Sequence, residues 1–206
     1  MRVTLADGLV LLQSRLSRLE QRELWNLCTS LADGPVPMYT PTVRGGKKMS
    51  VGMLCLGKHW NAVTYSYEAR RSDFDDLPAP PIPERLTDLA KAAAADAGFG
   101  IEPDICIMNY YSPAAKLGVH QDKDESRDTL ERGAPVVSVS LGDMARFLFG
   151  GHRRREPVES YWLESGDVFV FGGPARLRYH GVTRILPGTA PQDTGPGRIN
   201  LTFRQW

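Results

Sequence analysis

Residues 198–204 read RINLTFR, a run in which polar and apolar side chains alternate without a break. Because successive side chains on a β-strand point to opposite faces, this run predicts a strand with one apolar and one polar face. The apolar face would carry Ile199, Leu201 and Phe203. The polar face would carry Arg198, Asn200, Thr202 and Arg204. An ordinary half-exposed strand would turn that face to water, whereas inside a barrel its two guanidinium groups are spaced to bind both carboxylates of a small diacid.

The rest of the chain is rich in turns and short apolar runs. It has 20 Gly and 15 Pro among 206 residues, a proportion that favours a turn-rich β protein. Short apolar runs predict further strands over residues 49–56, 62–67, 104–111, 135–141, 146–149, 168–171 and 177–182. Neither βαβ alternation nor a Gly-rich phosphate loop is present, which argues against a doubly wound nucleotide-binding fold. We therefore expect a mainly β protein, a sandwich or jelly-roll barrel.

Two helices are expected to cover the strands. The first begins at the capping-box spacing of Ser17 and Glu20 and continues in apolar residues at helical spacing until Gly34. The second spans residues 84–97, between a Pro-rich loop and Gly98. At 206 residues the chain fits a single domain with a real hydrophobic core.

Charge and cysteine content limit the classes of function. A net charge of +1 excludes a polycation, so any nucleic-acid surface must be local. Two local clusters exist, six basic residues against one acidic residue between residues 44 and 71, and the run of three arginines at 153–155. The three cysteines are widely spaced and are expected to be buried, reduced thiols. No signal-peptide core and no run of eighteen apolar residues occurs, so we expect a soluble cytoplasmic protein, a monomer with no membrane partner.

The motif HQD at residues 120–122 is the first candidate for chemistry. On a strand, residues two apart share a face, so its imidazole and carboxylate can converge on one metal ion, although a solvated turn is the competing interpretation. A two-histidine, one-carboxylate iron site needs a further ligand, for which His59, His152 and His180 are available. We favour His180, in a predicted strand beside Gly181, and leave a purely structural role for it open. His59 and His152 have polar neighbours in sequence and are expected to be exposed.

Five blocks of sequence are together far more specific than any one alone. They are NYYSPAAKLGVHQDKDE (109–125), VSVSLG (137–142), FLFGG (147–151), RLRYHGV (176–182) and RINLTFR (198–204). In this order they resemble the AlkB family of Fe(II)/2-oxoglutarate dioxygenases, and the resemblance extends from about residue 37 to residue 206. It implies a double-stranded β-helix, the jelly-roll type suggested above, with covering α-helices.

The same resemblance implies the domain organisation and the residues of the site. Residues 1–206 would form one domain, with an N-terminal helical segment (1–35), a substrate-binding lid (36–70) and a jelly-roll core (100–206). Iron would be held by His120, Asp122 and His180. The cosubstrate 2-oxoglutarate would be held by Asn109, Tyr111, Arg198, Asn200 and Arg204.

The resemblance also implies a reaction and a substrate. The protein would use O₂ and 2-oxoglutarate to hydroxylate the methyl group of an N-alkylated base in DNA, with RNA as an open alternative, and release succinate, CO₂ and formaldehyde. The implied substrate residues are Trp60, Tyr67, Asp124 and Arg154. If the strand continues past Asp122, Asp124 points the same way, and a carboxylate there suits a cationic lesion such as 1-methyladenine or 3-methylcytosine. The two aromatic rings would then stack on the base, with ordinary core packing as the alternative.

Two other functions stay open from the sequence. The first keeps the chemistry and changes the target to a tRNA modification or a protein side chain. The second is a jelly-roll binding module that has lost turnover, against which the presence of all the implied iron ligands argues. The acidic and aromatic pocket of Trp60, Tyr67 and Asp124 is the feature that distinguishes a cationic base from the other targets.

Overall fold

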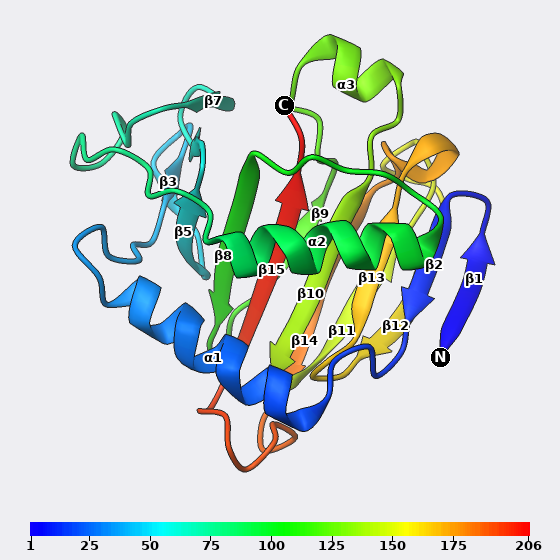
Figure 1. Ribbon diagram of the computed structural model, residues 1–206. Helices are drawn as coiled ribbons and strands as arrows, with labels where there is room; N and C mark the ends of the chain where they lie inside the picture. Colours follow the sequence, from blue (N-terminus) through cyan, green and yellow to red (C-terminus); the bar gives the residue numbers. More distant parts are fainter.

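The run RINLTFR forms strand β15 (Arg198–Arg204), which lies inside a seven-stranded sheet of the computed structural model, in which residues 1–206 are all described (Figure 1). The strand order of this sheet is β1-β2-β13-β10-β15-β8-β5, and every neighbouring pair is antiparallel. The other strands are β1 (Arg2–Ala6), β2 (Leu9–Leu12), β5 (Gly52–Leu56), β8 (Ile105–Tyr111), β10 (Val136–Gly142) and β13 (Val168–Phe171). Strands far apart in sequence are thus neighbours in space.

A four-stranded sheet packs against this large sheet. Its strands, in spatial order, are β12 (Glu159–Leu163), β11 (Met144–Phe149), β14 (His180–Leu186) and β9 (Leu117–His120). The side chains of β13 show how the layers are built, because Phe169 and Phe171 join the apolar cluster between the sheets while Val168 and Val170 join the cluster under the helices. Two sheets packed face to face in this way confirm the predicted jelly-roll fold.

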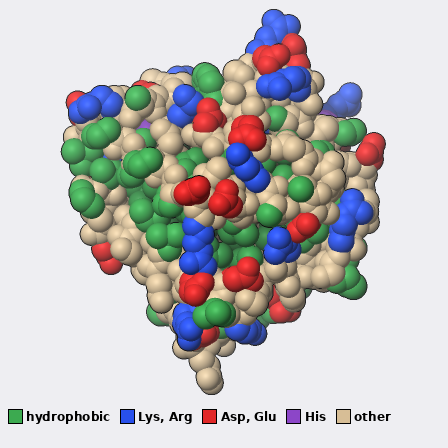
Figure 2. All heavy atoms as spheres, viewed as in Figure 1, with side chains coloured by type: hydrophobic (Ala, Val, Ile, Leu, Met, Phe, Trp, Pro, Cys, Tyr) green, Lys and Arg blue, Asp and Glu red, His purple; other side chains and the backbone are tan.

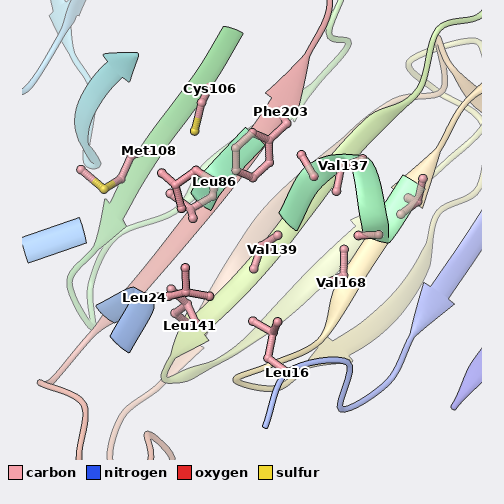
Figure 3. Close-up of a cluster of buried hydrophobic side chains, with 14 of the residues drawn as sticks. Leu16, Leu24, Leu86, Cys106, Met108, Val137, Val139, Leu141, Val168 and Phe203 are labelled. Atoms are coloured by element: carbon pink, nitrogen blue, oxygen red, sulfur yellow. The ribbon is translucent and has the colours of Figure 1, made fainter. Parts of the chain in front are cut away.

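Two helices cover the outer face of the large sheet (Figure 1). Helix α1 (Arg18–Ala32) begins with the predicted capping box of Ser17 and Glu20, and helix α2 (Glu84–Ala97) ends at Gly98, whose φ of 90° favours glycine. In Figure 3, Leu24 of α1 and Leu86 of α2 lie over the side chains of the sheet beneath them. On the helix-covered face, acidic and basic side chains are interspersed (Figure 2). This face therefore offers no surface of one charge.

The remaining elements lie around one end of the jelly roll or along its edge. They are the short strands β3 (Thr42–Val43), β4 (Lys47–Lys48), β6 (His59–Asn61) and β7 (Ser66–Glu68), the helix α3 (Arg127–Glu131), and a 3₁₀ turn η1 (Gly173–Ala175). Strands β3 and β4 form one hairpin, and β6 and β7 form another. Tyr67 of β7 joins a small apolar cluster with Ile105 and Ile107 of β8, so this second hairpin packs on the edge of the large sheet.

The structure corrects several predicted boundaries. The expected helical segment 1–35 contains α1 but begins with strands β1 and β2, and the jelly-roll core extends beyond residues 100–206 to include β2 and β5. Strand β2 was missed because Leu9–Leu12 is buried on both faces and so lacks period-two alternation. The predicted strand 62–67 is a hairpin turn that leads into β7. The predicted strand 177–182 begins only at His180, because η1 and the residues after it precede the strand.

The predictions of side-chain burial are confirmed for the three cysteines and for His152, and are wrong for His59. All three cysteines are buried and free, as predicted, and burial raises the pKa of Cys55 to about 11. His152 is exposed, also as predicted. His59 is fully buried, so its predicted exposure is wrong; the cause is Asp73, which pairs with its Nε2 at 2.7 Å and is distant in sequence. Among the helices of the fold, none combines the length and apolar character needed to cross a membrane.

Candidate active site

The four-stranded sheet and the loop after β9 bring His120, Asp122 and His180 together. His120 ends β9, His180 begins β14, and the two residues are direct partners in the ladder. Asp122 lies in the loop after β9, so the prediction that one strand carries both His120 and Asp122 is wrong. The predicted grouping of Asp122 with the two histidines holds. One ligand atom from each residue lies within 4.8 Å of the others. The Nε2 atoms of His120 and His180 are 3.5 Å and 3.4 Å from the carboxylate oxygens of Asp122.

Hydrogen bonds of the two imidazoles point their Nε2 atoms at the centre of this cluster. His120 Nδ1 lies 2.8 Å from the carbonyl oxygen of Gly118, and His180 Nδ1 lies 3.0 Å from that of Arg178. A carbonyl oxygen can only accept, so Nδ1 carries the proton in both rings. In its neutral form, each ring therefore presents an Nε2 lone pair, the arrangement of a metal-ligating histidine whose other nitrogen is fixed by an outer partner.

The electrostatics of the cluster favour the protonation states that a metal needs. Burial alone would raise the pKa of Asp122, but the Arg204 guanidinium, 2.7 Å from Oδ1, and the adjacent imidazoles hold that pKa well below its ordinary value. Burial lowers the pKa of His180 against the attraction of Asp122. Asp122 is consequently an anion at neutral pH, and His180 is a neutral base.

These residues fit Fe(II). Asp122 Oδ2 is buried and has no hydrogen-bond partner, a state that costs free energy unless a ligand satisfies the oxygen. Two imidazole nitrogens and one carboxylate form the donor set of non-haem Fe(II) oxygenases, which leaves other positions open for the reactants. The residues that would hold the iron are therefore His120, Asp122 and His180.

A small cavity beside the cluster contains most of the residues predicted to hold 2-oxoglutarate. Asn109, Tyr111, Asn200 and Arg204 line it together with Ser138 and Thr202. Asn109 and Asn200 are direct ladder partners on β8 and β15, and the Oδ1 atom of Asn109 is buried without a partner. The polar face of β15 therefore points into the interior, where the sequence pattern alone would also allow it to face water.

Arg198 lies apart from the other predicted cosubstrate residues. It is not among the residues that line the cavity, and it is the direct ladder partner of Tyr111, which does line it. Its guanidinium donates to Ser140 Oγ at 2.6 Å and to the carbonyl oxygens of Asp143 and Leu163 at 3.2 Å. No carboxylate pairs with it, its Nε is unpartnered, and burial lowers its pKa to about 10. A buried cation without an anion fits a carboxylate of 2-oxoglutarate.

A larger cavity, with a volume of about 360 Å³, opens over the metal cluster. It shares His120, Asp122, Asn109 and Arg204 with the small cavity. Its outer wall includes Trp60, Tyr65, Asp124 and Arg154. Trp60 Nε1 donates to Asp124 Oδ2 at 2.8 Å, and the rings of Trp60 and Tyr65 meet edge to face with centroids 5.6 Å apart. Aromatic rings and an acidic side chain thus line the large cavity beside the iron ligands.

Two details of the predicted substrate site are corrected. Tyr67 does not line the large cavity; it packs on the sheet edge, where its hydroxyl accepts a hydrogen bond from Arg204. Tyr65 takes the place beside Trp60. The sequence did not point to Tyr65, because the turn between β6 and β7 directs this residue into the cavity. Asp124 reaches the cavity from the loop after β9, held by Trp60, and not from a continuing strand.

Comparisons with known proteins agree with this geometry. Residues 8–204 match the family described as 2OG-Fe(II) oxygenase superfamily. The dioxygenase AlkB of Salmonella typhimurium is 42% identical over 205 residues, covering 98% of this chain and 91% of that protein. A protein of Arabidopsis thaliana called DNA N(6)-methyladenine demethylase ALKBH1C is 42% identical over 221 residues, covering 97% of this chain. The solved structure of OsALKBH1 superposes with a TM-score of 0.94 at 40% identity, with all of both chains covered.

A jelly roll with two histidines and a carboxylate at its mouth defines a non-haem Fe(II) oxygenase, and the chain belongs to the 2OG-Fe(II) oxygenase superfamily. Within that superfamily it belongs to the AlkB family, as its sequence blocks indicated. The chain spans about half the length of the Arabidopsis relatives, 48% of one and 49% of another. The cofactors of the family are Fe(II), 2-oxoglutarate and O₂.

Proposed function

We propose that this protein removes alkyl groups oxidatively from the nitrogen atoms of bases in DNA. The observation that carries the proposal is the cavity in which Trp60 and Asp124 face the cluster of His120, Asp122 and His180. When bound, Fe(II) and 2-oxoglutarate supply the oxidation of an N-methyl carbon by O₂, with release of succinate, CO₂ and formaldehyde. The chain supplies position, charge and exclusion of water.

The residues near the iron ligands have distinct proposed roles. Asn109, Tyr111 and Asn200 hydrogen-bond the cosubstrate, and Arg198 and Arg204 neutralise its carboxylates. Aromatic and aliphatic side chains on the other walls of the small cavity keep water away from the reacting atoms. They are Phe147, Phe171, Leu117 and Val182.

The outer cavity supports a flipped, cationic base as the substrate. Trp60 offers an aromatic face for stacking. Its Nε1 engages only Oδ2 of Asp124, so Oδ1 is left to face the base. A carboxylate that a bound base would shield from water favours 1-methyladenine and 3-methylcytosine, which carry a positive charge, over neutral bases. Arg154 at the rim and exposed Lys47 and Lys48 on β4 would contact the phosphates of the strand.

A second candidate substrate is N6-methyladenine, because two relatives from Arabidopsis thaliana are called DNA N(6)-methyladenine demethylases. This base is neutral, and its exocyclic N–H could donate to Asp124 Oδ1. RNA carrying the same lesions is a further candidate, because Trp60 and Asp124 are proposed to contact the base and not the sugar. The charge of Asp124 is the feature that favours the cationic lesions in DNA.

Mass spectrometry of defined substrates tests the proposal. The protein is reconstituted with Fe(II) anaerobically and then given O₂ with matched DNA and RNA oligonucleotides containing 3-methylcytosine, 1-methyladenine or N6-methyladenine, and a methylated peptide. We expect loss of one methyl group from the cationic bases in DNA, dependent on 2-oxoglutarate and accompanied by succinate. Turnover of the peptide alone, or of no substrate despite iron binding, would replace the proposal with a protein hydroxylase or a binding module.

A further inference from the structure

A chain of four buried, alternating charges runs behind the metal cluster. Arg176 Nη2 lies 3.0 Å from Glu125 Oε2, Glu125 Oε1 lies 3.4 Å from Arg204 Nε, and Arg204 Nη2 lies 2.7 Å from Asp122 Oδ1. The side chain of Glu125 has no exposed surface, and that of Arg176 is 2% exposed. Both oxygens of Glu125 lack an aligned hydrogen bond, so the two guanidinium groups hold this carboxylate chiefly by charge.

Arg176 connects the segments that carry two of the iron ligands. It follows η1 and lies four residues before His180. Its Nη1 donates to the backbone carbonyl oxygen of Asp122, and its Nε donates to that of Ala134 at 2.8 Å. One side chain therefore joins the loop after β9, the segment after α3 and the approach to β14. Its ion pair with Glu125 holds the guanidinium in the orientation that makes these bonds.

Arg204 sets which oxygen of Asp122 faces the metal position. Its Nη2 engages Oδ1, whereas the unpartnered Oδ2 faces His180 Nε2 at 3.4 Å. Glu125 and the hydroxyl of Tyr67 hold Arg204 from its other sides. Glu125 lines neither cavity, so it contacts neither the base nor the cosubstrate position.

We propose that Glu125 is a positioning residue that sets the affinity of the site for its metal, acting through Arg204 and Arg176. This inference rests on the iron-dependent function proposed above. Without the Glu125 charge, the Asp122 carboxylate would be the one anionic group left in this chain of charges to balance two buried guanidinium groups. The additional positive potential opposes a divalent cation and attracts a dianion. The affinities for metal and for 2-oxoglutarate should therefore change in opposite directions.

The decisive variant is Glu125→Gln, which keeps the shape and removes the charge. Mn²⁺ replaces Fe(II) as an air-stable probe, with free Mn²⁺ measured by electron paramagnetic resonance during titration of the full chain. Removing an outer partner of a metal ligand typically costs about 10–100-fold in metal affinity, and we expect a loss of this size. Calorimetry at saturating Mn²⁺ should give a Kd for 2-oxoglutarate that is equal to or lower than that of the wild type.

Two further variants complete the design. Glu131→Gln is the matched control, because Glu131 is an exposed glutamate on α3 whose ion pair with Arg127 lies at the surface, and its Mn²⁺ affinity should equal the wild type. Arg176→Lys keeps the charge and loses the forked donor to Glu125 and to the Asp122 carbonyl. It should weaken Mn²⁺ binding by less than Glu125→Gln does, and it provides the test if Glu125→Gln does not fold.

Each outcome decides one point. Weakened Mn²⁺ binding with retained 2-oxoglutarate binding supports the positioning role. Wild-type Mn²⁺ affinity in both Glu125→Gln and Arg176→Lys would overturn it while leaving the proposed function intact. Parallel loss of both ligands together with a lowered Tm would also overturn it, in favour of a purely structural role. A wild-type protein that binds no Mn²⁺ would instead refute the metal centre on which the proposed function depends.

Discussion

The two halves of the candidate site are built by different means. Around the iron ligands, backbone ladders set the side-chain positions, since His180 faces His120 and Asn200 faces Asn109 across paired strands. Part of the outer wall is formed by residues 37–79, called the lid, in which β5 belongs to the large sheet and the other strands form only two-stranded pieces. Side-chain hydrogen bonds hold it, among them the pair of His59 and Asp73, whose side chains are almost fully buried.

The polar contacts of the lid converge on its β6–β7 hairpin. Asp73 Oδ2 accepts from the backbone N–H of Ala62 at 3.1 Å. Asn61 Oδ1 accepts from the N–H groups of Val63 and Thr64 at 2.9 and 3.0 Å, which shapes the turn that directs Tyr65 into the cavity. A ladder tolerates many side chains because backbone groups form it, whereas each bond here depends on one side chain. The residues around the iron ligands, which backbone ladders position, and the residues of the lid, which side-chain hydrogen bonds position, can therefore change independently of each other.

The largest expected effect comes from the half of the site around the iron ligands, where Asp122 lies in the loop after β9. Asp122→Ala removes the anionic iron ligand and the partner of Arg204, so Mn²⁺ affinity should fall by more than the roughly 10–100-fold typical of outer partners, and demethylation should drop to background. The jelly-roll core does not include Asp122, so circular dichroism should still report a folded β protein. Metal affinity within a factor of two of the wild type would remove Asp122 from the centre.

The next effect separates the cosubstrate residues from the metal ligands. Arg198→Ala should raise the KM for 2-oxoglutarate about 10–100-fold, because a hydrogen-bonded charge contributes about 1.5–3 kcal/mol. Mn²⁺ affinity should stay near that of the wild type. Arg198 also bonds Ser140 Oγ and two carbonyls, so Tm should fall as well. An unchanged KM for 2-oxoglutarate would show that Arg198 serves only the core.

The charge of Asp124 should affect the base more than the oxidation. Asp124→Asn keeps an acceptor for Trp60 Nε1 and removes the negative charge. We expect turnover of 3-methylcytosine in DNA to fall about 10-fold, while decarboxylation of 2-oxoglutarate without DNA changes less than twofold, because the variant loses about 1.4 kcal/mol of attraction to a cation. Liquid chromatography of succinate and of the nucleosides measures both reactions. Equal losses in the two would place Asp124 in support of the metal ligands.

The sequence predicted the grouping of the iron ligands from short motifs, although it wrongly placed Asp122 on the same strand as His120. The alternation in residues 198–204 identified β15, and the motif at 120–122 with His180 identified the metal cluster. The lid depends on partners that sequence spacing does not reveal. His59 lies beside polar residues and was predicted to be exposed, yet Asp73, fourteen positions later, satisfies it in a fully buried position. Tyr65 reaches the cavity only through a turn with a φ of 58°, which no pattern of hydrophobicity encodes.

Breaking the His59–Asp73 pair should affect only the lid half. Asp73→Asn loses a buried charge-assisted hydrogen bond worth about 2 kcal/mol, which corresponds to a Tm lower by roughly 4–8 °C for a domain of this size. The KM for the DNA substrate should rise several-fold, while the affinity for Mn²⁺ and the KM for 2-oxoglutarate stay at wild-type values. Asp76→Asn, at an exposed carboxylate in the same loop, is the control. Loss of Mn²⁺ affinity in Asp73→Asn would show that the two halves are not independent.

The smallest expected effect concerns the exposed edge of the lid. Lys47 and Lys48 form β4, both are exposed, and neither has an ion-pair partner. If each contacts one phosphate of a single strand, the double variant Lys47→Ala with Lys48→Ala should reduce the slope of log K against log salt by about 1.4. Turnover at saturating DNA should not change, because these contacts lie outside both cavities.

The control is Lys91→Ala, at a half-buried lysine of α2 on the helix-covered face that pairs with Glu102, and it should leave the slope at its wild-type value. Fluorescence anisotropy with a labelled oligonucleotide, repeated over a range of salt concentrations, measures the slope. A bound base would shield Asp124 from solvent, so the Asp124 contribution should persist at high salt, whereas the lysine contribution is screened. A slope that falls equally in the lid and helix-face variants would mean that DNA binds without using the lid edge, and the strand would then have to approach the cavity from another side.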